Sequence, residues 1–198
     1  MNKILLILFL FTFQFLNANS LLFLGDSLTE GLGIDKEKAF PRLVEKMLQK
    51  KINKNIKVIN GGVSGSTTSD GLARLRWYLK RKPELIFIAL GANDGLRGLD
   101  LTQSKKNLEE IVFYAKKANA KVLLAGMLIP PNYGEKYAKD FEKMYKEIKD
   151  KYKLKSMDFL LKDVAGVQEL NQADGIHPNP KGHEIMANEV FNFLKEEL

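Results

Sequence analysis

The 198-residue chain contains no cysteine and only two histidines, His177 and His183. The absence of cysteine excludes disulfide bonds, thiolate metal ligands, a lipidated cysteine and a cysteine nucleophile. Two histidines without clustered carboxylates form a poor ligand set, so a metal-dependent hydrolase is disfavoured and we expect no metal site. Any nucleophile in this chain must therefore be a side chain other than cysteine.

Positive charge is in excess but is not concentrated. Lysine and arginine together number 31 against 24 acidic residues, which gives a formal net charge of +7. Such an excess can favour anionic partners such as phospholipid head groups. The lysines are, however, scattered along segments with helical spacing, and no basic run carries interleaved aromatics. We therefore interpret them as solvated helix faces and expect no nucleic-acid partner.

The N-terminus has the three-part pattern of a secretory signal peptide. Lys3 gives a positive start, residues 4–13 are apolar except for Thr12, and residues 14–20 turn polar and small. The apolar run is shorter than the roughly 20 residues that span a bilayer, which favours a cleaved signal peptide. The alternative interpretation is an N-terminal membrane anchor that the protein retains. We predict a signal peptide at residues 1–18, cleaved near Ala18 to Ser20, and a single domain at residues 19–198. The mature chain is then expected to be periplasmic or secreted, without an integral membrane segment.

Apolar runs alternate with longer helical patterns along the mature chain. Buried strands are predicted at residues 21–24, 56–59, 85–90, 122–128 and, more weakly, 157–161. Helical spacing of apolar residues predicts helices within residues 40–48, 72–79, 108–115, 141–148 and 185–194. This alternation, together with the near-continuous apolarity of the strands, predicts an α/β fold with a parallel sheet covered on both faces.

Small, polar and turn-forming residues follow the predicted strands. Ligand sites in such folds lie at the carboxyl ends of the strands, in the crevice where the strand order reverses. The loops expected at this edge contain residues 25–27, 60–65, 91–95, 130–134 and 174–179. The sequence therefore predicts that these loops open on one edge of the sheet.

Ser27, Asp174 and His177 have the side chains needed for nucleophilic catalysis. Taken alone, Ser27 is a favourable helix cap and His177 is a loop residue before a proline. Asp174 precedes His177 by three residues across a tight turn, close enough for its carboxylate to hold one imidazole nitrogen. The other nitrogen can then take the proton of a serine hydroxyl, which makes the serine reactive. We predict Ser27 as the nucleophile, His177 as base and then acid, and Asp174 as the residue that orients His177.

Three donors for an oxyanion hole are predicted at the same edge. Attack on an ester or thioester places negative charge on the carbonyl oxygen, which requires hydrogen-bond donors already in place. We predict that these donors are the backbone amides of Ser27 and Gly65 and the side-chain amide of Asn93. Considered singly, Asn93 is a turn former and Gly65 a position of positive φ.

Four motif blocks give the chain a resemblance to the SGNH, or GDSL, hydrolases. Residues 25–28 (GDSL) are similar to the block that carries the nucleophile, and Gly65 is similar to the glycine of the second block. Residues 91–94 (GAND) are similar to the asparagine block, and residues 174–178 (DGIHP) to the last block. The blocks occur in the order and spacing of the family, so the resemblance covers essentially the whole mature chain.

The resemblance is closest to the branch of periplasmic acyl-CoA thioesterases, lysophospholipases and arylesterases, through residues 93–98 and 132–134. It implies a three-layer α/β/α sandwich with a five-stranded parallel sheet in flavodoxin-like order, and no cofactor. It also implies a serine esterase that hydrolyses acyl esters or thioesters through an acyl-enzyme. The expected partner is a small acyl ester, thioester or lysophospholipid, and the chain is expected to be a monomer.

Two predicted loops supply the expected contacts with the acyl group. Leu96, Ile129, Pro131 and Tyr133 are predicted to bind substrate, with ordinary loop packing as the alternative interpretation. One alternative function is a carbohydrate O-acetylesterase that acts on cell-wall glycan. Another is a catalytically silent binding module that keeps the fold, although the complete set of serine, aspartate and histidine argues against it.

Overall fold

A sheet of five parallel strands lies at the centre of the described residues, which are residues 20–198 of the computed structural model. In chain order the strands are β1 (Ser20–Gly25), β2 (Lys57–Gly62), β3 (Leu85–Ala89), β4 (Lys121–Ala125) and β5 (Lys155–Met157). Their order across the sheet is β2-β1-β3-β4-β5. The order reverses at β1, so a ligand crevice is expected at the carboxyl ends of β1 and β3.

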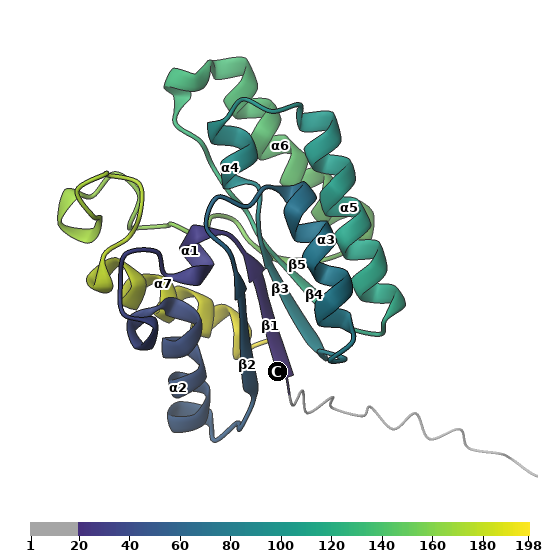
Figure 1. Cartoon of the computed structure of the whole chain (residues 1–198), viewed down its shortest axis with the longest axis vertical. Coiled ribbons are helices and arrows are strands. Elements are labelled where there is room, and N and C mark those ends of the chain that lie inside the picture. Colours follow the sequence, from purple (N-terminus) through teal and green to yellow (C-terminus); the bar gives the residue numbers. More distant parts are fainter. Residues whose placement is uncertain (1–19) are drawn as a thin grey trace, which may run out of the picture.

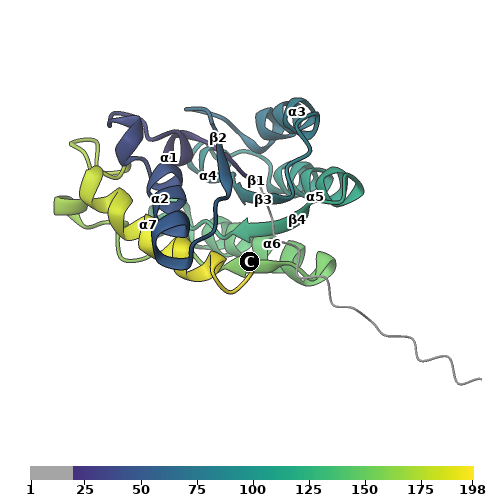
Figure 2. The same cartoon turned by 90° about the horizontal axis from the view of Figure 1, so that it is seen from below.

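Two layers of helices cover the sheet (Figure 1). The helices are α1 (Ser27–Glu30), α2 (Phe40–Ile52), α3 (Thr68–Leu79), α4 (Ala92–Leu96), α5 (Leu101–Lys117), α6 (Glu135–Tyr152) and α7 (Pro180–Leu194), with short 3-10 turns at Lys36–Lys38, Pro131–Tyr133 and Gln168–Leu170. Helix α2 packs on α7 at one face, while α3 packs on α5 and α5 on α6 at the other (Figure 2). The predicted three-layer sandwich and flavodoxin-like strand order are confirmed.

Strands β1 and β3 form the middle of the core. Their apolar side chains are almost completely buried because helices cover both faces of the sheet. Phe23 of β1 packs edge-on against Phe40 of α2 and also contacts Phe87 of β3. Strand β2 differs from the prediction, since it lies at the edge of the sheet and most of its residues stay partly exposed.

The bounds of three strands differ clearly from the predicted ones, and β2 covers Lys57–Gly62 rather than residues 56–59. Strand β4 ends at Ala125 rather than at residue 128, and β5 covers residues 155–157 rather than 157–161. The Gly126 amide donates to the Met157 carbonyl (2.9 Å), and the Leu160 amide then donates to the Gly126 carbonyl (3.0 Å). The first bond is the last one of the parallel ladder between β4 and β5, and the pairing of the two strands ends there. Met127 and Leu160 are nevertheless buried, so hydrophobicity alone placed the ends of β4 and β5 too late.

The short helices α1 and α4 were not predicted. Each has only four or five residues, which is too short to show a periodic pattern of apolar residues. Both begin within three residues of the end of a strand, and they carry Ser27 and Asn93 to the carboxyl edge of the sheet.

None of the helices within residues 20–198 is both long enough and apolar enough to cross a membrane. The predicted signal peptide at residues 1–18 lies outside the described residues.

Candidate active site

Ser27 is the first residue of α1 and lies two positions after the end of the central strand β1. The Asp26 carboxylate caps this helix by accepting a hydrogen bond from the Leu28 amide (3.0 Å). Capping fixes the first turn of the helix, because it satisfies an amide that has no partner inside the helix. Ser27 is therefore held at a defined place, with only 8% of its surface exposed.

The structure brings the three predicted catalytic side chains together. The Nε2 atom of His177 lies 2.9 Å from the Ser27 hydroxyl oxygen, and Nδ1 of the same ring lies 2.7 Å from an Asp174 carboxylate oxygen. The other Asp174 oxygen accepts the amides of Ile176 and His177, each at 3.0 Å. These hydrogen bonds, the His177 amide first, lower the pKa of Asp174 to about 2. Asp174 is therefore charged at neutral pH and can orient the imidazole.

Gln172 joins the loop that carries Asp174 and His177, here called the histidine loop, to the segment that carries Ser27. Its side-chain amide donates to the Leu32 carbonyl (2.7 Å), just beyond α1, and to the Pro178 carbonyl (3.0 Å). Its backbone amide donates to the His177 carbonyl (2.8 Å). One residue therefore contacts both chain segments that supply the Ser27–His177 pair. The sequence reasoning missed Gln172, because nothing local marks it.

The three predicted oxyanion donors follow β1, β2 and β3. The Ser27 amide is at the N-terminus of α1, and Gly65 lies in the loop after β2 with a φ of 75°. No hydrogen bond within residues 20–198 uses either of these two backbone amides. Asn93 donates one side-chain hydrogen to the Ser66 carbonyl (3.0 Å), and its amide group carries a second hydrogen. All three groups thus have a donor available for a ligand.

The Gly65 loop is tied to α1 by close backbone packing. A Cβ atom added to Gly62 would lie 2.2 Å from the Glu30 nitrogen, so only glycine permits this approach. The Asn60 side chain donates to the Thr29 carbonyl (2.9 Å), and the Ser64 amide donates to the Glu30 carboxylate (2.7 Å). The segments that carry Ser27 and Gly65 therefore form one unit.

A buried carboxylate holds α4 in place beside Asn93. Asp94 is 2% exposed and accepts the Thr68 amide (2.9 Å), the Thr68 hydroxyl (2.6 Å) and the Ser104 hydroxyl (2.9 Å). These bonds join α4 to the N-termini of α3 and α5. Sequence reasoning assigned no role to Asp94, because its partners are distant in the sequence.

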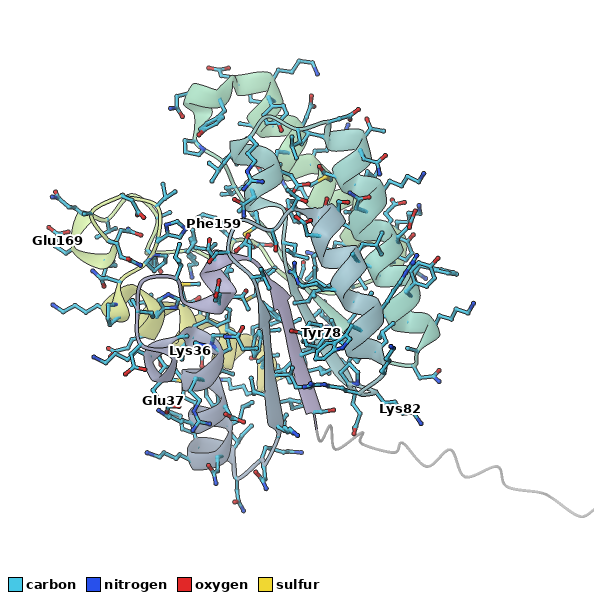
Figure 3. All side chains as sticks on the ribbon, in the orientation of Figure 1. Lys36, Glu37, Tyr78, Lys82, Phe159 and Glu169 are labelled. Carbon is cyan, nitrogen blue, oxygen red and sulfur yellow. The ribbon has the colours of Figure 1, made fainter. Side chains whose placement is uncertain are left out.

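An apolar cavity of about 280 Å³ adjoins Ser27 and His177. Its apolar lining residues come from five segments: Leu28, Ala92 and Leu96, Leu128 and Pro130, Phe159, Leu161 and Ala165, and Ile176. Phe159, labelled in Figure 3, is drawn near α1, whose Leu28 lines the same cavity. The site therefore places a nucleophile–base pair at the wall of an apolar cavity.

Comparison with known proteins identifies the family. Residues 23–185 match the GDSL-like lipase/acylhydrolase family. The chain belongs to this family.

Relatives of this GDSL hydrolase extend over nearly its whole length. It is 39% identical to esterase TesA of Pseudomonas aeruginosa, over 90% of this chain and 89% of that protein. It is 36% identical to thioesterase 1/protease 1/lysophospholipase L1 of Escherichia coli K12, over 92% of this chain and 86% of that protein. A crystal structure of TesA aligns with a TM-score of 0.87 at 39% identity, covering 90% of this chain and 99% of that chain. The predicted enzyme class is confirmed: the GDSL hydrolase is a carboxylic ester hydrolase.

The four predicted substrate contacts of the GDSL hydrolase lie at different places. Leu96 lines the cavity. Ile129 is 8% exposed and packs in the core, and Tyr133 is 44% exposed; neither lines the cavity. Pro131 begins a 3-10 turn, and its side chain lies outside the description. Eight of the nine apolar lining residues were not predicted, and four of them, Phe159, Leu161, Ala165 and Ile176, lie in residues 158–176, which the sequence pattern assigned in part to a strand.

Asp26 of the GDSL hydrolase is a buried carboxyl at the floor of the site. It is completely buried, and one of its oxygens has no hydrogen-bond partner among the described residues. Burial raises the pKa of Asp26 to about 6, because the charged form loses its hydration. The carboxyl is thus a group whose charge changes close to neutral pH.

His183 has a structural position away from this site. Its Nδ1 accepts the Phe40 amide (3.2 Å) at the N-terminus of α2, and its ring stacks on that of Phe40. Burial lowers the pKa of His183 to about 4, so the ring is neutral at neutral pH. This placement agrees with the choice of His177 as the candidate base.

Proposed function

We propose that this carboxylic ester hydrolase works through an acyl-enzyme on Ser27. The observation that carries the proposal is the continuous chain of hydrogen bonds from Asp174 through His177 to the Ser27 hydroxyl. Such a chain makes a weak alcohol nucleophile reactive, because the base lies within hydrogen-bond distance of the proton it removes.

In the first half of the reaction, Ser27 Oγ attacks the acyl carbon while its proton moves to His177 Nε2. The carbonyl π bond opens, and its electron pair resides on the oxygen. When the oxygen re-forms the carbonyl, the bond to the alcohol or thiol breaks, and the leaving group takes the proton from His177. Asp174 keeps the imidazolium oriented and charge-balanced throughout.

In the second half, water takes the place of the alcohol or thiol. His177 removes a proton from the water, and the oxygen attacks the acyl-serine carbon. Collapse of the second tetrahedral intermediate returns the proton to Ser27 Oγ and releases the carboxylic acid. The Ser27 and Gly65 amides and the Asn93 side chain would stabilise the oxyanion in both halves, and losing one such donor typically costs about 3 kcal/mol.

The cavity favours an aliphatic acyl group as the part of the substrate bound beside Ser27. Its wall is largely apolar, and Leu128 and Ile176 are both lining and partly exposed, so the wall continues outward. Burial of each methylene contributes about 0.8 kcal/mol to binding, which rewards longer chains over acetyl. With relatives named esterase and thioesterase 1/protease 1/lysophospholipase L1, we propose acyl esters, thioesters and lysophospholipids as substrates.

We also propose that the chain acts in the periplasm or outside the cell. The proposal rests on the pattern of residues 1–20, with removal of residues 1–18 or a cut as late as Ser20. Cell fractionation and N-terminal sequencing of the mature chain test it. A chain that is found in the membrane fraction and still begins at residue 1 would contradict it.

The mechanism is tested with p-nitrophenyl esters from acetyl to palmitoyl, assayed with the mature chain, Ser27→Ala and Ser69→Ala. Ser69 is an exposed serine of α3 and serves as the control. We expect turnover by the wild type and by Ser69→Ala, no measurable turnover by Ser27→Ala, and a preference for acyl chains longer than acetyl. A preference for acetyl esters and acetylated glycan would favour an O-acetylesterase. Folded proteins inactive on every substrate would favour a silent binding module.

A further inference from the structure

Arg74 is a half-buried cation in the middle of α3 that the proposed chemistry does not use. It forms no ion pair with any carboxylate in residues 20–198. Burial lowers the pKa of Arg74, and the nearby Asp70 and Asp26 carboxyls offset only part of this effect. A protein that keeps an arginine in such a place needs a reason other than charge pairing.

The guanidinium of Arg74 bridges two of the loops that make the candidate oxyanion hole. One terminal nitrogen donates to the Gly25 carbonyl (2.8 Å), at the end of β1 and two residues before Ser27. The other donates to the Ser66 hydroxyl (2.6 Å), one residue after Gly65. The same fork therefore touches the segments that present the Ser27 and Gly65 amides.

The third donor is connected through Ser66. Asn93 donates its side-chain hydrogen to the Ser66 carbonyl (3.0 Å). Arg74 holds the side chain of Ser66, and Ser66 in turn holds the side chain of Asn93. Gly25 ends β1, Ser66 lies in the loop after β2, and Asn93 lies in α4 after β3, so the three residues belong to segments at the ends of three different strands.

We propose that Arg74 is a positioning residue that sets the relative placement of the three oxyanion donors. The inference rests on the proposed function, because it assigns Arg74 a task in the same reaction. Arg74 does not line the cavity beside Ser27, so it acts through Gly25 and Ser66 rather than on the substrate.

The chemistry of arginine suits this task better than that of lysine. The guanidinium is a planar fork with donors in fixed directions, so two acceptors bonded to it are held at a fixed separation. A lysine ammonium carries the same charge on a flexible stem and cannot impose that geometry. Because misplacement by about 1 Å can lower a rate about 100-fold, small shifts of these loops should reduce turnover more than binding.

The experiment compares wild type, Arg74→Ala, Arg74→Lys and Arg76→Ala in thermal unfolding and in steady-state kinetics on p-nitrophenyl butyrate. Arg76 lies on the same helix, is exposed, and contacts the Tyr114 ring, so it is the matched control. The inhibition constant of butane-1-boronic acid is also measured. This compound forms a tetrahedral adduct with a serine, with an oxygen in the position of the oxyanion.

For Arg74→Ala we expect kcat to fall about 30- to 100-fold, with KM within about 3-fold of wild type. Boronate inhibition should weaken by a similar factor, because adduct and transition state use the same donors. In Arg74→Lys, kcat should fall almost as far as in Arg74→Ala even though the charge is kept. Arg76→Ala should have the kcat and the boronate inhibition constant of wild type. A purely structural role predicts a lower unfolding temperature, with kcat and boronate inhibition unchanged for the folded fraction, and this result would overturn the proposal.

Ser66→Ala keeps the inference testable if Arg74→Ala fails to fold. Removing the Ser66 hydroxyl leaves Arg74 intact but deletes one of its two acceptors, and we expect kcat to fall about 10-fold. In the double variant Ser66→Ala with Arg74→Lys, the fall in kcat should be smaller than the product of the two single falls. Both substitutions remove the same hydrogen bond, which joins Arg74 to the Ser66 hydroxyl. Falls in kcat that multiply in the double variant, or an unchanged kcat in the single variants, would contradict the proposal. Failure of the proposed function itself would show separately, as a Ser27→Ala variant with undiminished turnover.

Discussion

The serine side of the site consists of short turns at the ends of β1, β2 and β3, whereas Asp174 and His177 lie on the long segment between β5 and α7. On the serine side, Asp26 is fully buried and Gly62 packs against the α1 backbone. On the histidine side, the Asp174 side chain is 46% exposed and Ile176 is 52% exposed.

This difference follows from what each side has to do. Oxyanion donors stabilise charge best when they are fixed before the reaction, so they belong on a packed framework. The histidine has to exchange protons with serine, leaving group and water, so access from solvent is useful to it. The arrangement predicts that substitutions at the tightly packed positions of the serine side lower stability more than substitutions at the open positions of the histidine side.

The largest contrast is expected between two glycines. In Gly62→Ala, the new Cβ would lie 2.2 Å from the Glu30 nitrogen and 2.7 Å from the Thr29 carbonyl carbon, both backbone atoms that cannot turn aside. We expect a loss of about 3 kcal/mol or more in the free energy of unfolding. Gly175 has a φ of 74° but open space around it, so Gly175→Ala should lose only about 1 kcal/mol. Urea unfolding of both variants measures the contrast, and equal losses would contradict it.

The two acids should affect stability in opposite directions with pH. The pKa of Asp26 is raised from 3.8 to about 6, so its contribution to the free energy of unfolding is fully present below pH 3.8. That contribution is lost as pH rises through 6. The change amounts to about 2–3 kcal/mol, at about 1.4 kcal/mol per pKa unit. Asp26→Asn should therefore gain stability relative to wild type between pH 4 and pH 7.

Asp174 supplies the control for this measurement. Its pKa is lowered from 3.8 to about 2, so its contribution is present above pH 3.8 and is lost only as pH falls through 2. The Asp174 carboxyl itself should thus stay charged and add no pH dependence between pH 5 and pH 7, the range in which Asp26 titrates. His183, whose pKa is about 4 and whose neutral form favours folding, is present in wild type and in both variants. Its effect on stability therefore cancels when each variant is compared with wild type at the same pH. A flat difference for Asp26→Asn would contradict its raised pKa.

The smallest effect is expected at Gln172, which connects the two sides. Gln172→Ala loses the hydrogen bonds to Leu32 and Pro178. We expect about 1 kcal/mol less stability and about a 10-fold lower kcat, because His177 is then less well oriented toward Ser27. Gln168→Ala, an exposed glutamine of the same segment, is the control. If both variants kept the wild-type kcat, the histidine loop would not depend on this link.

Much of the fold was predictable because its signals are local. Five apolar runs and five helical patterns were enough for the parallel sheet and its two covering layers. Ser27, Asp174 and His177 were found from their chemistry and their positions after predicted strands, and their roles remain predictions. The links through Arg74, Asp94 and Gln172 were not predictable. They join residues far apart in the sequence, so only the fold brings them into contact.

The cavity shows the same limit. Met127, Ile129, Leu160 and Phe159 are all apolar, yet only Phe159 faces the cavity, because the chain turns out of the sheet at Gly126. Hydrophobicity predicts burial but does not distinguish a core contact from a substrate contact.

The central claim is that Ser27 becomes covalently modified during the reaction. The most direct test is mass spectrometry of the protein after treatment with an alkyl fluorophosphonate, which forms a stable adduct with an activated serine. We predict one adduct per chain on the peptide that contains Ser27, none in Ser27→Ala, and far slower labelling in His177→Ala. Labelling of another residue, or equal labelling of Ser27→Ala, would contradict the account.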